Sequence, residues 1–184
     1  ACGRNDPEVY EIPKETQTMR ITRAEPSGQG PTSMANQRLP EEALNLDADR
    51  PTWTLPEGWE ESAGSAMRVA TLTIEGAPSI DFSVTSFPGD VGGLLNNVNR
   101  WRRQIGLPPV GEPALANLIA PVKGGDLEGT LVTLTDDNES TLAAIFDWNG
   151  NSWFFKMTGS ATEISSQEAA FLQFLSSLRF NNPA

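Results

Sequence analysis

An Asn-Gly pair between two runs of alternating apolar residues constrains the fold of this chain more than any other feature. Apolar side chains occupy every second position before and after Asn149-Gly150. Such alternation is typical of a strand with one buried face, and Asn-Gly favours a type I′ hairpin turn, whose two central residues need positive φ. The sequence therefore predicts an antiparallel meander. Its strands are 130–135, 141–148 and 152–158, with a turn at 136–139.

Earlier in the chain, short runs rich in Val, Ile, Thr and Phe predict further strands. Two of these runs are separated by Gly76-Ala77-Pro78-Ser79, a combination that favours a turn. A third, shorter run contains Trp53 and Trp59. The expected additional strands are 53–59, 67–75 and 80–87.

Helical periodicity appears between and after the predicted strands. Leu94, Val98, Trp101 and Ile105 recur at helical spacing. We expect Asp90 to cap this helix and Gly106 to end it. A shorter helix is expected over 113–119, and Ser165 to Glu168 resembles a capping box that opens a closing helix. The expected fold class is α+β: an antiparallel sheet of about six strands flanked by helices in an α/β/α sandwich.

The first fifty residues differ from the rest of the chain in composition. They are polar and contain many prolines, so they lack the apolar surface that would offset the entropy of ordering. We expect two regions: an extended leader over 1–50 and a globular domain over 51–184. The only cysteine, Cys2, follows the small residue Ala1, as at the site where signal peptidase cuts before the cysteine of a bacterial lipoprotein, which predicts a lipid anchor; an ordinary free thiol is the alternative.

Charge and composition exclude several function classes. The chain has 13 basic and 24 acidic residues, a net charge of -11 that disfavours binding to nucleic acid. It contains no histidine, and therefore lacks the most common general base and transition-metal ligand. No apolar run reaches the roughly 20 residues of a membrane-spanning helix. We therefore expect a non-enzymatic protein without a cofactor or a metal.

Four segments of the chain resemble a group of uncharacterised bacterial lipoproteins, and the order of its elements resembles the fold of PsbP and the Mog protein. This resemblance implies a PsbP-like sandwich over about residues 51–180 and a non-enzymatic docking or accessory role. It supplies no catalytic residues. The segments are 87–102 (FPGDVGGLLNNVNRWR), 106–109 (GLPP), 153–159 (WFFKMTG) and 171–175 (FLQFL).

Three arginines form the one concentrated basic feature of the acidic domain. Arg100, Arg102 and Arg103 belong to the first predicted helix, and helical geometry places Arg103 opposite its buried side with the other two on the flanks. Arginine is favoured at interfaces, so these residues are candidate contacts for an acidic partner. A solvated face paired with local acids is the alternative.

Other candidate contacts are aromatic or apolar. Trp59 stands next to Gly58 and two glutamates, and of the five tryptophans it is the one that we expect to be partly exposed. Tyr10 and Ile12 lie in a short apolar piece of the leader that could dock on a partner. An anion site around Asp90 to Gly93 is disfavoured because the Asp90 carboxylate would occupy it. We expect the acidic segment 136–139 to be a solvated turn rather than a calcium loop.

These features predict a lipid-anchored accessory subunit at the extracytoplasmic face of a bacterial membrane. Its partners would be the membrane, through the lipid on Cys2, and protein subunits of a larger membrane complex. The resemblance to PsbP implies a photosynthetic or electron-transport complex as one host. The alternative is an extracytoplasmic lipoprotein that binds a small ligand or a polymer between its helices and its sheet.

Overall fold

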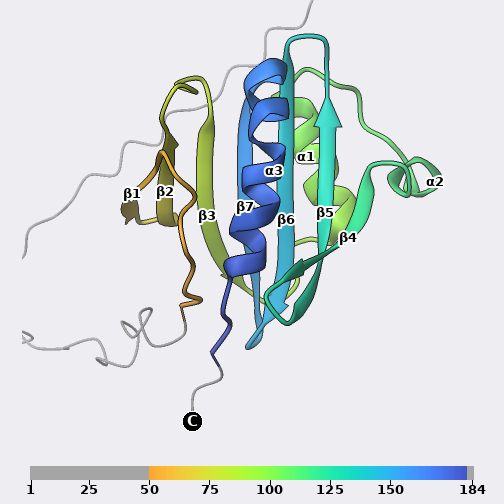
Figure 1. Ribbon diagram of the computed structural model, residues 1–184. Coiled ribbons are helices and arrows are strands. Elements are labelled where there is room, and N and C mark those ends of the chain that lie inside the picture. The colour runs from red at the N-terminus through yellow and green to blue at the C-terminus, as the bar shows by residue number, and fades with distance from the viewer. Residues whose placement is uncertain (1–49, 182–184) are drawn as a thin grey trace, which may run out of the picture. The chain divides into compact units, whose positions relative to one another are not determined.

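The computed structural model describes residues 50–181, which form an antiparallel β-sheet with helices on both faces (Figure 1). The strand order is β1-β2-β3-β7-β6-β5-β4. The strands are β1 (Trp59–Ser65), β2 (Arg68–Ile74), β3 (Asp81–Pro88), β4 (Ile119–Gly124), β5 (Leu127–Thr135), β6 (Glu139–Trp148) and β7 (Asn151–Ser160). The helices are α1 (Leu94–Gln104), α2 (Glu112–Leu115) and α3 (Ala161–Ser177).

The β6–β7 hairpin forms as the sequence predicts. Asn149 and Gly150 have φ values of 50° and 73°, so both central residues have the positive φ of a type I′ turn. Trp148 pairs with Asn151 at the end of the ladder. The turn fixes the register, and the register sends alternate side chains of both strands to opposite faces of the sheet.

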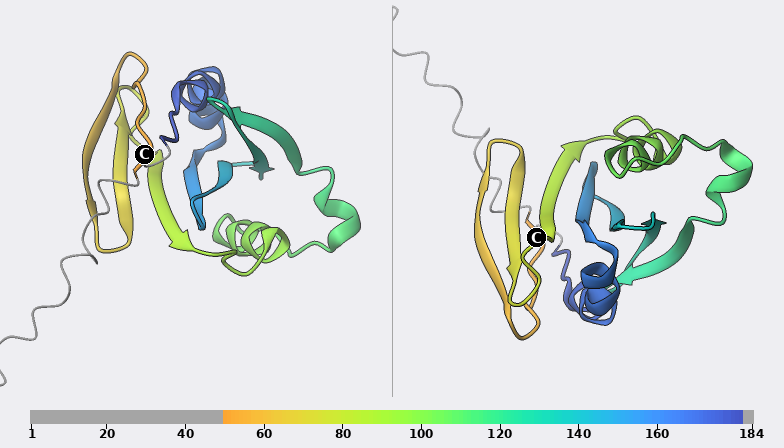
Figure 2. Two further views of the ribbon diagram at one scale, coloured as in Figure 1. Left: turned by 90° about the horizontal axis from the view of Figure 1, so that it is seen from below. Right: turned by 90° about the horizontal axis from the view of Figure 1, so that it is seen from above.

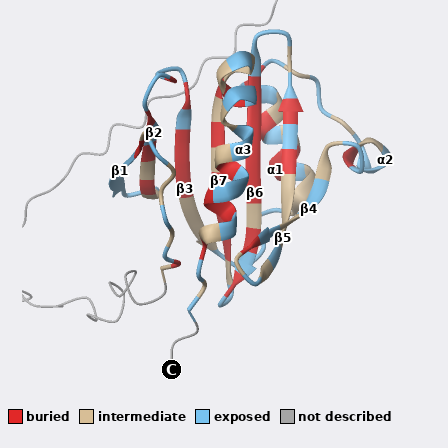
Figure 3. Ribbon diagram, in the orientation of Figure 1, coloured by how far each residue is buried: buried red, intermediate tan, exposed pale blue. Residues whose placement is uncertain are grey.

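The two faces of the sheet support two separate apolar clusters (Figure 2). On the first face, α3 buries Phe171 and Phe174 against β3, β6 and β7. On the opposite face, α1 buries Val98 and Trp101 against β5, β6 and β7. Burial is greatest in the central strands, whereas β1 is exposed along most of its length (Figure 3). The α+β sandwich is therefore confirmed.

The structure has seven strands over the residues it describes, against about six expected. Two of them, the edge strands β1 and β4, were not predicted, and β4 contains Pro121. Proline lacks an N–H group and is tolerated at a sheet edge, but it weakens the strand pattern in the sequence. The helix expected over 113–119 is shorter and consists only of α2.

The prediction of a first strand over 53–59 was wrong, because β1 begins where that segment ends. Trp53 instead lies on the α3 face, where its ring meets Phe155 and Phe174 at centroid distances of 6.0 and 5.8 Å. The segment before β1 therefore covers part of the sheet beside α3 instead of joining the sheet as a strand.

Two helix starts also differ from the prediction. Helix α3 begins after Ser160, whose hydroxyl accepts a hydrogen bond from the Glu163 N–H, so the Ser165 box lies inside the helix. The N-cap residue of α1 is Gly93 rather than Asp90. The Asp90 carboxylate accepts the Gly93 N–H at 3.0 Å and thus stabilises the turn that precedes the helix.

Candidate functional site

Helix α1 is held in place at its end and along its buried side. Gly106 has a φ of 77°, and the Leu107 N–H reaches back to the Arg102 carbonyl at 2.8 Å. This is a Schellman ending, which glycine permits. On the buried side, Trp101 meets Phe154 of β7 edge to face at 6.1 Å. The anchored helix presents its remaining side chains to solvent in fixed positions.

The three arginines of α1 have different environments. Arg100 is exposed and donates to the Asn97 side-chain oxygen at 2.5 Å. Arg102 is half-buried, and its Nε donates to the Pro108 carbonyl at 2.7 Å, so it holds the loop after the helix. Arg103 is exposed. We call Arg100 and Arg103 the α1 arginine surface.

Acidic side chains of the described part of the chain form no salt bridge with the α1 arginine surface. Within residues 50–181, the two salt bridges join Arg50 to Glu61 and Arg68 to Asp81. The domain from Pro51 onward contains 15 acidic and seven basic residues. The α1 arginine surface is therefore a local concentration of positive charge on a domain that is negative as a whole.

Lys156 lies beside this surface, although no sequence motif points to it. It belongs to β7 and is half-buried, and its ammonium group donates to the Gln104 side-chain oxygen of α1 at 2.9 Å. Burial lowers the pKa of Lys156; the charge of Asp81 raises it, whereas the charges of Arg100 and Arg68 lower it further. In the sequence, Lys156 is distinguished only by its charge, which lies within the otherwise apolar run 153–157.

A row of hydroxyl side chains leads across the sheet to Lys156. Strand pairing places Ser62 opposite Thr71, Thr71 opposite Ser83, and Ser83 opposite Lys156. The strand neighbours of Thr71 and Ser83 belong to the apolar cluster on the α3 face, so this row lies on the α1 face. We call Ser62, Thr71 and Ser83 the hydroxyl row. No helix of the described residues covers it, because α1 packs on β5, β6 and β7 (Figure 2).

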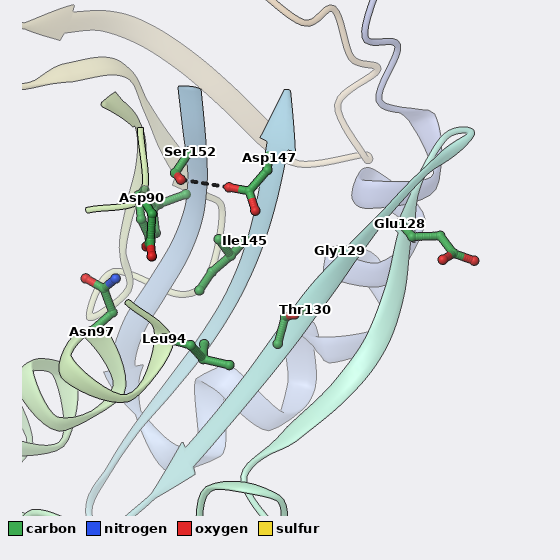
Figure 4. Close-up of a pocket in the computed structure, with 10 residues that line it drawn as sticks. Asp90, Leu94, Asn97, Glu128, Gly129, Thr130, Ile145, Asp147 and Ser152 are labelled. Carbon is green, nitrogen blue, oxygen red and sulfur yellow. Dashed lines mark hydrogen bonds between the residues drawn. The ribbon is translucent and has the colours of Figure 1, made fainter. Parts of the chain in front are cut away.

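A separate pocket of about 450 Å³ opens near the first turn of α1 (Figure 4). Leu94, Ile145 and Phe154 supply its apolar lining. Ser152 donates to Asp147 at 2.7 Å and to the Gly89 carbonyl at 2.9 Å, and Figure 4 shows Asp90 close to this pair. Because carboxylates stand on its rim, the pocket does not suit an anion.

Cation sites are also constrained. Across residues 50–181, no group of three or more His, Cys, Asp or Glu side chains is placed to hold a metal ion. The acidic segment after β5 forms the hairpin turn to β6, and the Asp136 N–H donates to the Glu139 carbonyl at 2.8 Å. The prediction of a turn at 136–139 is therefore confirmed.

Trp59 is a core residue, and the prediction that it is partly exposed was wrong. Only 6% of the residue is accessible. Its ring lies 5.4 Å from that of Phe82 and 5.6 Å from that of Phe174, and its indole N–H donates to Gln167 at 3.1 Å. Three further candidates lie outside the described residues, namely Cys2, Tyr10 and Ile12.

Comparisons with known proteins give similar structures but no family. No family model and no curated protein matches the sequence. Cyanobacterial PsbP (CyanoP) from Synechocystis sp. PCC 6803 is similar, with 12% identity, a TM-score of 0.48, and coverage of 74% of this chain and 89% of that one. PsbP is thus among the solved structures to which this chain is similar, as the sequence resemblance led us to expect.

Two other solved structures are similar at the same low level. LpqN of Mycobacterium tuberculosis, described as involved in cell envelope biogenesis, has 10% identity, a TM-score of 0.43, and coverage of 72% of this chain and 83% of that one. A protein of Bacteroides thetaiotaomicron VPI-5482 has 12% identity and a TM-score of 0.44. This chain covers 45% of the Bacteroides protein with 72% of its own length. These similarities assign a role to no residue.

Proposed function

We propose that this chain is a non-enzymatic accessory subunit of a membrane protein complex, held at the extracytoplasmic face of the membrane by a lipid on Cys2. The domain binds an acidic surface of a partner protein through the α1 arginine surface. The sequence resemblance to PsbP makes a photosynthetic or electron-transport complex the first host to examine.

The observation that carries the docking role is the state of Arg100 and Arg103. Both are exposed on a helix fixed by its buried side, and neither forms a salt bridge with an acid of residues 50–181. Arginine has a planar head with several donors, which suits it to carboxylates of another protein. An acidic partner would supply the counter-charge that the described residues do not.

The lack of histidine in the sequence supports the non-enzymatic part of the proposal. Histidine is the side chain whose ordinary pKa lies nearest to neutral pH, and it is the most frequent general base. The side chains that contact the α1 arginine surface and Lys156 are the neutral amides of Asn97 and Gln104, whose oxygens accept hydrogen bonds from Arg100 and Lys156. These cations and amides favour binding of a negative group over proton transfer.

Lipid attachment is proposed from the Ala-Cys-Gly sequence around Cys2 and the polar, proline-rich segment that follows it. Within residues 50–181, none of the helices combines the length and apolar character that crossing a bilayer requires. Multiple acyl chains anchor a protein stably, whereas one chain binds only marginally. We expect Cys2→Ser to move the chain from the membrane fraction to the supernatant of lysed cells. A variant that stays with the membranes would contradict the anchor.

Co-purification tests the docking role. The tagged chain is isolated from membranes in mild detergent, and the amount of co-purifying protein is compared between wild type and Arg100→Ala/Arg103→Ala. We expect the double variant to lose most of its partner, with an unchanged melting temperature. Lys123→Ala is the matched control, because Lys123 is an exposed cation on the β4 edge. Equal recovery of the same partner by wild type and the double variant would contradict the proposal.

A further inference from the structure

We propose that the docking surface continues from α1 across the hydroxyl row, and that Lys156 there accepts a carboxylate from an acidic segment of a partner protein. The inference rests on the proposed function and identifies the chemistry of the group bound at that site. It arises from a juxtaposition of residues from four strands and one helix that are far apart in the sequence.

The geometry forms a continuous polar path along one row of the sheet. Ser62 is exposed, Thr71 is half-buried and Ser83 is 7% accessible, so the row becomes more buried toward Lys156. Beyond Lys156, the same row continues into Ala143, which lies under α1 in the apolar cluster. Lys156 therefore stands at the border between the uncovered polar face and the apolar core.

Lys156 has no anionic partner at this border. Its hydrogen-bond acceptor is the neutral amide of Gln104, and the acids of residues 50–181 form no salt bridge with it. Asp81 lies near, but Arg68 binds both of its carboxylate oxygens, at 2.7 and 2.8 Å. Burial lowers the pKa of Lys156 more than the charge of Asp81 raises it, and the charges of Arg100 and Arg68 lower it further. The ammonium group is therefore destabilised at this position, and a second negative charge nearby would stabilise it.

The surroundings favour a protein carboxylate over an extended polyanion. The domain from Pro51 onward is negative overall, with 15 acids against seven bases, and would repel nucleic acid or a strongly anionic membrane. Four of the seven bases of the domain are Lys156 and the arginines of α1, whereas Lys123 lies on the β4 edge. Thr71 adds a hydroxyl donor on a sheet face without a covering helix, where an extended acidic segment of a protein can lie. The Ser62 hydroxyl donates to the Thr71 carbonyl at 3.2 Å, and Ser83 is only 7% accessible.

A single substitution separates binding from a structural role. Lys156→Met keeps the length of the side chain and removes its charge. If Lys156 is a binding group for an anion that the described residues do not supply, this variant of the full-length chain should have a higher melting temperature than wild type. The reason is that the substitution removes the partly desolvated positive charge of the ammonium group. Its affinity for hexaglutamate, followed by NMR titration, should fall about tenfold, as expected for the loss of one charge-assisted hydrogen bond. Lys123→Met, at the far sheet edge, should change neither quantity.

Titrations with other ligands test whether the bound group is a carboxylate. Hexaglutamate should shift the resonances of Ser83, Lys156 and Arg100 in the wild-type chain, whereas hexaglutamine should not. A lower melting temperature of Lys156→Met, or unchanged affinity for hexaglutamate, would overturn the inference. So would absence of shifts at these residues, or equal shifts with inorganic phosphate. None of these outcomes alters the co-purification expected for the α1 arginine surface. A wrong inference about Lys156 can therefore be distinguished from a wrong proposed function.

Discussion

Arg68 and Asp81 form the best-defined ion pair among the described residues, and it makes folding stability depend on pH. The bidentate hydrogen bonds from Arg68 hold the pKa of the Asp81 carboxyl below its ordinary value of 3.8. A carboxyl whose pKa is lowered by folding stabilises the fold above the unfolded-state pKa, and this contribution is lost as the pH falls through the folded-state pKa. The pair therefore stabilises the protein at neutral pH.

Asp81→Asn should test this contribution. The two side chains are 32% and 54% accessible, so solvent screening limits the loss of unfolding free energy at pH 7 to about 0.2–1 kcal/mol. In urea unfolding, the difference between variant and wild type should be present at pH 7 and shrink as the pH falls below the ordinary carboxyl pKa of 3.8. Asp126→Asn, an exposed acid without a salt bridge within residues 50–181, serves as the control. A difference that persists in acid would contradict the assignment.

At the scale of single residues, local signals predicted structure well and distant contacts did not. The turn at Asn149 and Gly150 is specified by these two neighbouring residues alone, and their positive φ values confirm the prediction. The burial of Trp59 depends on Phe82 and Phe174, which lie far along the chain. Lys156 becomes notable only when strand pairing places it beside Ser83. Strand pairing between distant segments cannot be read from residue types alone.

The start of α3 gives a prediction at the scale of one element. The Ser160 hydroxyl accepts the Glu163 N–H, whereas Ser165 lies exposed inside the helix. Loss of an N-cap costs about 0.5–2 kcal/mol, and Ala is a better helix former than Ser. Ser160→Ala should therefore lower the unfolding free energy by about 1 kcal/mol, whereas Ser165→Ala should leave it unchanged or raise it slightly. The reverse order in chemical denaturation would contradict the observed start.

The sequence contains two serine-glutamate pairs with capping-box spacing, and tertiary contacts decide between them. Glu163 accepts the Ser79 N–H at 3.1 Å from the loop before β3, and the Ser160 N–H donates to the Ser79 hydroxyl at 3.0 Å. These contacts tie the helix start to a loop about eighty positions earlier. Periodicity located the helix, but its first residue required the folded neighbourhood.

For the molecule as a whole, the sequence predicted the class of fold but not the uneven cover of the sheet. Alternating strands and two amphipathic helices were sufficient to indicate an antiparallel sheet between helices. They did not show that the apolar cluster beneath α1 draws its buried sheet residues from β5, β6 and β7. The candidate site depends on this offset, because it leaves the hydroxyl row without a covering helix beside Lys156.

At the scale of the whole molecule, the distribution of charge explains why the proposed docking site would bind an acidic partner. An acidic domain is repelled by most acidic surfaces, and a confined basic surface lets it select a partner in one orientation. Because Arg102 is engaged with Pro108, we restrict the proposed docking surface to Arg100 and Arg103, whereas Arg102 supports the helix end. The three arginines that looked equivalent in the sequence thus have different environments.

The most direct test of docking through α1 is the migration of the chain in native electrophoresis of membranes solubilised in mild detergent. We expect the wild-type chain to migrate with a larger complex. Charge reversal in Arg100→Glu/Arg103→Glu should release it to the position of the free protein, whereas Lys123→Glu should not. Wild-type chain found only at the position of the free protein, or a charge-reversed chain still within the complex, would contradict docking through α1.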